Sequence, residues 1–368
     1  MELGLGTVQF GLDYGVSNAS GRTPEPEVRR ILELAAGSGL RVLDTAAAYG
    51  ESESVLGRCL PGAGDFLVIT KTAPLGQARG EAAAPGLVRE GFARSLARLG
   101  LPAVDGLLAH HAADLLGPGG DAVFAVLDGL RREGLARRIG LSVYSGEDID
   151  AALARFDIDL IQVPANVLDQ RLVSGGQLAR LKARGVEVHV RSVFLQGLLL
   201  LDPAAAPAYF APVRPRLAAW RQALDEAGLT PAQGALAFAR SLDADVVLVG
   251  VENAAQLAAN VSDYAAAQGA GLDFAAFALN DEKYVNPGKW ELAARAGTRS
   301  SRAWPPSRRC RPPACPGPGC GGPPPRCSWP SCPGAARRRV RPRRACPRSS
   351  PTPWAAGPTS CPGTSAAG

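Results

Sequence analysis

Cysteine is scarce in most of this 368-residue chain: residues 1–297 contain Cys59 alone, and the other seven cysteines lie in residues 298–368. A body with a single cysteine has no disulfide framework, which is usual for proteins of a reducing compartment. The chain also lacks a run of about 20 apolar residues, the length that a membrane-spanning helix needs. Its start, MELGLGTVQFG, has neither the basic nor the continuous apolar segment of a signal peptide. We therefore expect a cytoplasmic protein without membrane partners.

Acidic residues are missing from the last part of the chain. Residues 298–368 contain no Asp, Glu or Lys, but 13 Arg and 17 of the 31 prolines. Since the whole chain carries +6 and this part +13, residues 1–297 carry a net charge of −7. A net negative charge removes the main electrostatic argument for a nucleic-acid enzyme, so we expect no nucleic-acid partner for residues 1–297.

Residues 298–368 have too few aliphatic side chains to form a core and are predicted to be a disordered, low-complexity tail. Their cysteines are irregularly spaced with no histidine among them, which does not fit a zinc site, so we expect no metal. The composition is also what an out-of-frame stretch of a GC-rich gene would encode. We therefore expect one domain, residues 1–297, followed by a tail that is a candidate frameshift product.

Strand-like and helix-like segments alternate through residues 1–297. Eight segments are predicted to be strands, near residues 2–10, 40–44, 66–71, 104–110, 137–143, 158–164, 186–193 and 244–250. The segments between them have apolar residues at three- and four-residue spacing, as amphipathic helices do. Eight strands, each followed by helix, predict an α/β fold of the (β/α)8 TIM-barrel class. A doubly wound fold is disfavoured, because GLGTVQFG has Gln9 where the dinucleotide fingerprint needs its third glycine.

Ionisable side chains follow three consecutive predicted strands. Asp44 ends the second strand and Tyr49 lies in the loop behind it; Lys71 ends the third and His110 the fourth. Active sites of (β/α)8 barrels lie at the carboxyl ends of the strands. There, Tyr49 could donate a proton to a carbonyl oxygen, with Lys71 lowering its pKa and Asp44 holding Lys71. His110 could donate a hydrogen bond to the developing oxyanion. Taken singly, each residue is equally explained by capping, packing or exposure to solvent.

Residues 2–290 resemble the aldo/keto reductases. The resemblance rests on motifs in family order: GLGTVQFG, LDTAAAYGESESVLG, VITKTA, DGLLAHHAADL, RRIGLSVYSGEDI, IQVPANVLDQ, VRSVFLQGLLL, VLVGVENAAQLAANV and NPGKW. It implies a barrel that reduces an aldehyde or ketone with NADPH or NADH. It also implies a catalytic tetrad of Asp44, Tyr49, Lys71 and His110. His110 fits better than its neighbour His111, because the family's histidine directly ends the apolar run.

The resemblance also implies cofactor-binding residues at the later strand ends. Ser142, Gln162 and Asn166 would hold the nicotinamide carboxamide, and Phe194 would pack beside the nicotinamide. Residues 192–197 and 250–253 would bind the phosphates, with Gln256 and Asn260 near the adenine. The implied set is Thr7, Ser142, Gln162, Asn166, Ser192, Phe194, Gln196, Gly197, Gly250, Glu252, Asn253, Gln256 and Asn260. For Ser142, Gln162 and Asn166 an alternative is that they only cap buried backbone groups.

Glu252 departs from the family pattern, in which NADPH-preferring members commonly have Arg or Lys after the eighth strand. A carboxylate there would repel a 2′-phosphate, so we expect NADH to serve at least as well as NADPH. The alternative is that Glu252 is only an acidic residue near a helix N-terminus, where the helix dipole favours it. The substrate is expected to be a small carbonyl compound, with a hint of sugar-related metabolism. Two other functions remain open, a nicotinamide-binding regulatory module and a Schiff-base aldolase using Lys71; the oligomeric state is open as well.

Overall fold

The computed structural model describes residues 1–60, 66–76, 83–267 and 271–292. The strands of this part are all parallel and pair in chain order into a closed barrel, with the last strand beside the first. They are β1 (Glu2–Gly6), β2 (Val42–Asp44), β3 (Leu67–Lys71), β4 (Val104–Ala109), β5 (Ala136–Ser142), β6 (Leu160–Pro164), β7 (Glu187–Arg191) and β8 (Val246–Gly250). The predicted (β/α)8 fold is confirmed.

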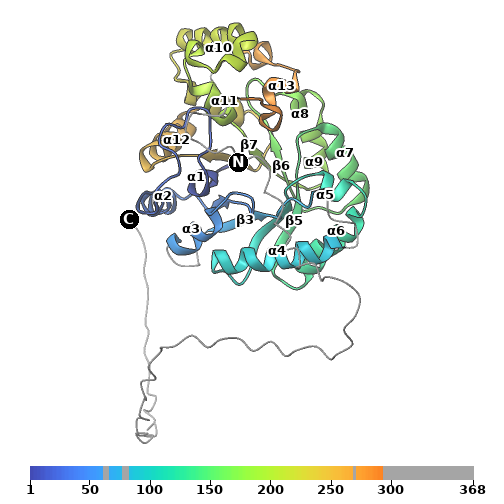
Figure 1. The fold of residues 1–368 in the computed structure, drawn as a ribbon. Helices are drawn as coiled ribbons and strands as arrows, with labels where there is room; N and C mark the ends of the chain where they lie inside the picture. The colour runs from blue at the N-terminus through green and yellow to red at the C-terminus, as the bar shows by residue number, and fades with distance from the viewer. Residues whose placement is uncertain (61–65, 77–82, 268–270, 293–368) are drawn as a thin grey trace, which may run out of the picture. The chain divides into compact units, whose positions relative to one another are not determined.

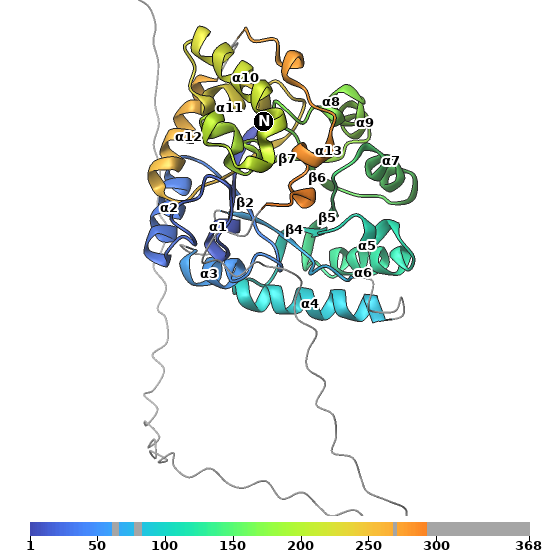
Figure 2. The same ribbon diagram turned by 45° about the horizontal axis from the view of Figure 1, so that its top comes forward.

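Helices alternate with the strands and surround the barrel, as Figure 1 shows. The longer ones are α2 (Glu25–Gly37), α3 (Ser52–Cys59), α4 (Ala84–Leu99), α6 (Gly120–Arg132), α7 (Gly146–Arg155), α9 (Gln177–Ala183), α10 (Arg214–Glu226), α11 (Pro231–Arg240) and α12 (Ala254–Ala266). Single-turn helices are α1 (Val8–Gly11), α5 (Ala113–Leu116), α8 (Arg171–Ser174) and α13 (Glu282–Val285). Figure 2 shows α10, α11 and α12 as neighbours on one side of the barrel. In the described part, no helix is long and apolar enough to cross a membrane.

Local sequence signals explain several helix boundaries. α11 begins with a capping box, in which the Thr230 side chain accepts from the Gln233 backbone and Gln233 returns a bond to the Thr230 N–H. α4 ends at Gly100, whose φ of 66° is a left-handed conformation that glycine adopts without a steric penalty. α7 begins at Ser145, whose hydroxyl accepts from the Asp148 N–H.

Apolar side chains pack on both faces of the barrel strands. The larger cluster lies between the strands and the surrounding helices, and a smaller one comes from strands alone. The smaller cluster is Val42, Ile69, Leu108, Leu160, Val246 and Leu248. Since strand side chains alternate between faces, the residues two positions further along point into the same interior, nearer the rim. Those residues include Asp44, Lys71, His110, Gln162 and Gly250.

Two predicted strands extend two or more residues past the carboxyl ends of the observed ones. The first was expected to span residues 2–10, but β1 ends at Gly6 and the chain turns into α1, which buries Phe10. The seventh was expected to reach residue 193, but β7 ends at Arg191 because Ser192 has a left-handed φ of 62°. The predicted tail, residues 298–368, lies outside the described residues, and the domain boundary at residue 297 stays a prediction.

Candidate active site

A cavity of about 570 Å³ opens at the rim where the strands end. This volume lies within the range of about 300–1,000 Å³ typical of small-molecule sites. Asp44, Tyr49 and His110 line one part of the cavity, and Gln256 and Asn260 of α12 line another. The cavity therefore joins the predicted catalytic residues to the region predicted to bind the adenosine end of a cofactor.

Asp44 and Lys71 form a buried ion pair at the carboxyl ends of β2 and β3. The Lys71 Nζ lies 2.7 Å from both carboxylate oxygens of Asp44, and it also donates to the Thr45 carbonyl at 2.9 Å. Only 1% of the Lys71 side chain is exposed. Burial lowers the pKa of Lys71 and the Asp44 carboxylate opposes that shift. With three acceptors for its three N–H groups, Lys71 is held as an ammonium.

Tyr49 is positioned by the loop between β2 and α3. Its N–H donates to the Ala46 carbonyl at 3.0 Å, and its own carbonyl accepts from the Ser52 N–H at 3.0 Å. The ring centre lies 5.0 Å from the Lys71 Nζ and 5.6 Å from the His110 ring centre, edge to face. The four predicted catalytic residues are therefore brought together in space.

The electrostatics of Tyr49 differ from the expectation. Burial raises the pKa of Tyr49 above its ordinary value, and the Asp44 carboxylate raises it further. The cation that opposes this shift is Arg191. The predicted lowering by Lys71 does not dominate, because Asp44 contacts Lys71 directly and compensates its charge. The phenol is thus a protonated donor in the protein alone.

His110 is a neutral imidazole in this site. Burial lowers the pKa of His110 to about 3, and the Lys71 charge lowers it in the same direction. Its backbone N–H donates to the Thr72 hydroxyl at 3.3 Å, and its Nδ1 is buried without a partner in the structure. His111 also lines the cavity, and its ring centre is 5.3 Å from that of His110. A neutral imidazole can still donate one N–H to a substrate oxygen.

The residues predicted to hold the carboxamide are placed differently from one another. Ser142 is buried and lines the cavity. Gln162 is fully buried, and its Nε2 donates to Asp44 at 2.7 Å; its Oε1 has no hydrogen-bond partner among the described residues. Asn166 accepts from the Leu168 and Asp169 backbones at 3.0 Å and donates to the Ser192 carbonyl. Neither Gln162 nor Asn166 lines the cavity. The Asn166 side chain instead holds the backbone of its own loop and that of Ser192 through hydrogen bonds.

Thr7 links the end of β1 to the end of β2 and the start of α3. Its hydroxyl donates to the Asp44 carbonyl at 2.9 Å and contacts the Ser52 hydroxyl at 2.9 Å. Thr7 also lines the cavity. It therefore supports the backbone of Asp44 from below the site.

The loop after β7 has an unusual backbone. Ser192, Leu195 and Gln196 have left-handed φ angles of 62°, 47° and 53°, which non-glycine residues rarely adopt. Strain of this kind collects at ligand sites. Among the described residues, no hydrogen bond occupies the backbone N–H groups of Val193 or Phe194. These donors and the left-handed turn fit a phosphate-bearing cofactor.

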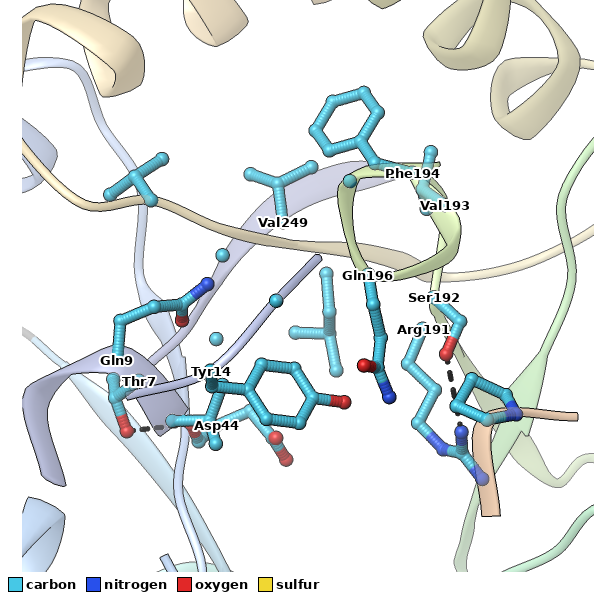
Figure 3. A pocket seen from close by; sticks show the side chains of 18 of the residues that line it. Thr7, Gln9, Tyr14, Asp44, Arg191, Ser192, Val193, Phe194, Gln196 and Val249 are labelled. Atoms are coloured by element: carbon cyan, nitrogen blue, oxygen red, sulfur yellow. Dashed lines mark hydrogen bonds between the residues drawn. The ribbon is translucent and has the colours of Figure 1, made fainter. Parts of the chain in front are cut away.

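Gly197 and Phe194 complete this loop. Gly197 has a φ of 88°, and a Cβ on it would meet the Ser17 hydroxyl at 1.9 Å, so only glycine fits there. Phe194 is 9% exposed and lines the cavity together with Ser192 and Gln196. The predicted cofactor segment thus lies on the cavity wall, as Figure 3 shows for its labelled residues.

The turn between β8 and α12 forms the other predicted contact. Gly250 packs against the Gln9 side chain, where a Cβ would come within 2.7 Å of its Nε2. Glu252 lines the cavity, and its N–H donates to Gln256 Oε1 at 2.7 Å. Asn253 is the N-cap of α12 and accepts from the Gln256 N–H at 2.9 Å, but it does not line the cavity.

A second carboxylate lies at this helix start. Glu27 of α2 accepts a hydrogen bond from the N–H of Ala254, the first residue of α12, at 2.8 Å. That bond lowers the pKa of Glu27. The N-terminus of α12 is therefore already occupied by acidic and amide oxygens of the protein itself.

Several cavity residues were not singled out from the sequence. Arg191, Tyr14, Tyr144 and Asp263 line the cavity but are not among the site residues predicted from the sequence. Arg191 lies over the Tyr144 ring, 4.2 Å from its centre. Its position near the end of the seventh predicted strand is the sequence signal that points to it. In the described part of the chain, no group of three potential ligands could hold a metal ion.

A parallel eight-stranded barrel with a buried Asp–Lys pair beside a Tyr and a His at the strand ends defines a class of barrel oxidoreductases. A sequence profile of the aldo/keto reductase family matches residues 2–268. The chain belongs to this family, and the resemblance noted in the sequence is confirmed. Members of the family use NADPH or NADH, which is the cofactor class that the sequence predicted.

Individual relatives agree with the profile. An aldo-keto reductase of Mycobacterium ulcerans is 38% identical over 142 residues, which cover 38% of this chain and 46% of that protein. The NADH-specific methylglyoxal reductase of Escherichia coli is 30% identical over 179 residues, covering 44% and 54%. The chain thus spans about half the length of the curated relatives it matches. The holo form of aldo-keto reductase AKR11C1 from Bacillus halodurans is 24% identical with a TM-score of 0.60, covering 71% of this chain and 86% of that one. At this identity the likeness shows the fold.

Proposed function

We propose that the protein reduces an aldehyde or ketone to an alcohol with NADH or NADPH, with Tyr49 as proton donor. The observation that carries this proposal is the convergence of Tyr49, His110 and the Asp44–Lys71 pair on one cavity. When bound, the cofactor supplies a hydride to the carbonyl carbon. The protein must then place the carbonyl oxygen, protonate it and exclude water.

The proton path begins at the Tyr49 hydroxyl. As negative charge develops on the carbonyl oxygen, that oxygen becomes basic enough to take the Tyr49 proton, and solvent later restores it. The phenolate left on Tyr49 is stabilised by the Arg191 cation and destabilised by Asp44. Since Lys71 neutralises Asp44 at 2.7 Å, the ion pair keeps a bare carboxylate from opposing this step.

His110 orients the carbonyl. Its pKa of about 3 keeps the ring neutral through the physiological range. A neutral ring donates a hydrogen bond to the oxygen without competing with Tyr49 as an acid. Such preorganised donors typically contribute about 10²–10³ in rate.

The two alternative functions fit the geometry less well. A Schiff-base aldolase needs a free amine that reaches the substrate, whereas Lys71 is bound by three oxygens and does not line the cavity. A regulatory module that binds nicotinamide would not need a buried ion pair beside Tyr49 and His110. Because a buried ion pair also contributes to stability, turnover of a carbonyl compound is the measurement that separates a reductase from a binding module.

We further propose that the substrate is a small carbonyl compound and that NADH is preferred to NADPH. The NADH-specific methylglyoxal reductase among the relatives makes methylglyoxal a useful first probe, together with sugar-related carbonyls suggested by the sequence. The acidic groups at the start of α12 favour NADH over NADPH.

The test is cofactor oxidation by the purified full chain with a panel of aldehydes, ketones and keto-sugars. Tyr49→Phe should lower kcat/KM by about 10²–10⁴, the range of general acid catalysis, while the Kd for cofactor stays close to that of the unmodified protein. Tyr264→Phe is the matched control, because the Tyr264 hydroxyl has no hydrogen-bond partner within the described ranges and Tyr264 does not line the cavity. Equal turnover by Tyr49→Phe and Tyr264→Phe would refute Tyr49 as the donor.

A further inference from the structure

Arg191 is an uncompensated cation in the active-site cavity. It ends β7 and lines the cavity together with Tyr49 and His110. Its guanidinium donates to the Val143 carbonyl at 3.0 Å and to the Ser192 hydroxyl at 3.3 Å. In the described ranges no carboxylate lies within ion-pair distance of it.

The charges that line the cavity are unevenly distributed. Lys71, the other cation near the catalytic residues, is neutralised by Asp44. The remaining acidic residues of the wall are Glu252 and Asp263, which lie beyond β8 and on α12. The catalytic end thus has a net positive charge from Arg191, and the opposite end is negative.

Arg191 is also held in a fixed orientation. The Tyr144 ring lies against its guanidinium at 4.2 Å, a stacking that suits the flat guanidinium group. Two N–H groups bind neutral oxygens, so three of the five donors remain for a ligand. Figure 3 shows the hydroxyl of Tyr14 and the amide of Gln196 pointing into the same part of the cavity. This arrangement resembles a preformed anion site more than a surface arginine.

We propose that Arg191 binds an anionic group of the substrate, so that the preferred substrates are carbonyl compounds bearing a carboxylate or a phosphate. This inference rests on the proposed function and names the substrate class of the same site. Guanidinium groups bind both kinds of anion through paired N–H donors.

The alternative occupant of Arg191 is the diphosphate of the cofactor. Two observations favour the substrate. The charge of Arg191 acts on Tyr49 and on His110, the groups that meet the carbonyl. The next loop residues, Val193 and Phe194, offer backbone N–H groups that no described hydrogen bond uses, so a diphosphate has donors there.

The first experiment compares shape-matched substrates on the unmodified full chain. 4-Carboxybenzaldehyde and 4-nitrobenzaldehyde have almost the same outline, but only the first is an anion. Glyceraldehyde 3-phosphate and glyceraldehyde form the phosphate pair. The expected result is a kcat/KM at least about 10-fold higher for the anion of one pair, the scale of one charge-assisted hydrogen bond. Equal or lower values for both anions would overturn the inference while leaving carbonyl reduction intact.

The second experiment changes Arg191. Arg191→Met should remove the preference for the anion, and Arg191→Lys should restore part of it because the charge returns. Arg94→Met, at an exposed site on α4, controls for loss of an arginine. The Kd for NADH, from its fluorescence, should change less than the anion preference. A Kd that rises as much as the preference falls would assign Arg191 to the cofactor instead.

A binding measurement separates this inference from the proposed function. Calorimetric titration with benzoate and with neutral benzyl alcohol needs no turnover. Benzoate binding that is lost in Arg191→Met supports the anion site even if no carbonyl compound is reduced. No difference between benzoate and benzyl alcohol in the unmodified protein would contradict the anion site even if reduction is observed.

Discussion

The acidic residues at the start of α12 lead us to a prediction about cofactor preference. Glu27 lies against the N–H of Ala254, and Glu252 lines the adjoining cavity wall. NADPH differs from NADH by a 2′-phosphate, a group with about −1.5 to −2 charges. We expect that this phosphate is repelled and that NADH is preferred.

The magnitude follows from charge and exposure. Two unit charges about 4 Å apart interact by about 4 kcal/mol at an effective dielectric of 20. The Glu27 side chain is 22% exposed, and Arg30 lies 3.1 Å from its second oxygen, so solvent and a cation screen part of this energy. A remainder near 1.4 kcal/mol corresponds to a tenfold ratio of dissociation constants. We therefore expect Glu27→Gln to shift the NADPH-to-NADH ratio of Kd about tenfold toward NADPH.

The control lies on the same helix. Glu25 is two residues from Glu27 in the first turn of α2, but it pairs with Arg58 instead of α12. Glu25→Gln removes one negative charge without touching the helix start, so its ratio should stay near that of the unmodified protein. Glu27→Gln keeps an oxygen that can accept from the Ala254 N–H, which preserves the cap. Glu252→Arg should move the ratio further, since it replaces repulsion by attraction.

The assay is fluorescence titration of NADH and NADPH against each protein, supported by kcat/KM for both cofactors. Raising the salt concentration should shrink the difference between cofactors, because screening weakens exposed charges. A strong NADPH preference in the unmodified protein, unchanged in Glu27→Gln and Glu252→Arg, would show that the 2′-phosphate is bound elsewhere. The reasoning would then be refuted.

Three further predictions concern stability and pH. Asp44→Asn leaves the Lys71 charge buried without its partner, so the free energy of unfolding should fall by about 3–5 kcal/mol in urea titrations. A loss of stability no larger than that from breaking an exposed ion pair would contradict the burial of Asp44 and Lys71. The pKa of His110 is about 3 in the folded protein and about 6.5 in the unfolded chain, so the unfolded chain binds more protons between these pH values. The free energy of unfolding should therefore fall as the pH drops through this window, by at most about 1.4 kcal/mol per pH unit for this residue. His110→Asn should reduce that slope. Gly11→Ala places a Cβ 1.8 Å from the Tyr49 carbonyl and should lower both the melting temperature and the turnover. Gly91→Ala on α4, where the added Cβ meets only the flexible end of an arginine, should be neutral or stabilising by about 0.5–1 kcal/mol. A larger loss of stability in Gly91→Ala than in Gly11→Ala would refute the packing argument.

The barrel and the grouping of the four proposed catalytic residues could be predicted because both follow from local patterns. Asp44 and Lys71 each end a short apolar strand, and a parallel barrel brings all strand ends to one rim. Apolar runs such as LVIT reveal strands buried on both faces. The alternation of side chains then places Lys71 two residues beyond Ile69 on the same interior face.

Other features depend on contacts between distant parts of the chain. Glu27 and Ala254 are separated by 227 positions, and no local pattern signals that one caps the other. The same holds for Gln162, which was predicted to hold the carboxamide but binds Asp44 across 118 positions in this state. Left-handed φ at Ser192 shortened a strand that the apolar pattern had extended. Sequence periodicity reports which face a residue occupies, but not which partner meets it there.

The distribution of charge along the cavity links the two specificity proposals. Asp44 and Lys71 form an ion pair, so Arg191 is the charge that we propose acts on the substrate, while Glu27 and Glu252 are the charges at the start of α12. A substrate without an anionic group would lose the contact with Arg191, and a cofactor with a 2′-phosphate would be repelled at the start of α12. An anionic substrate and a cofactor without a 2′-phosphate each avoid the cost at their own end. The two preferences act at opposite ends of one cavity on separate residues, so the effects of Glu27→Gln and Arg191→Met on free energy should add.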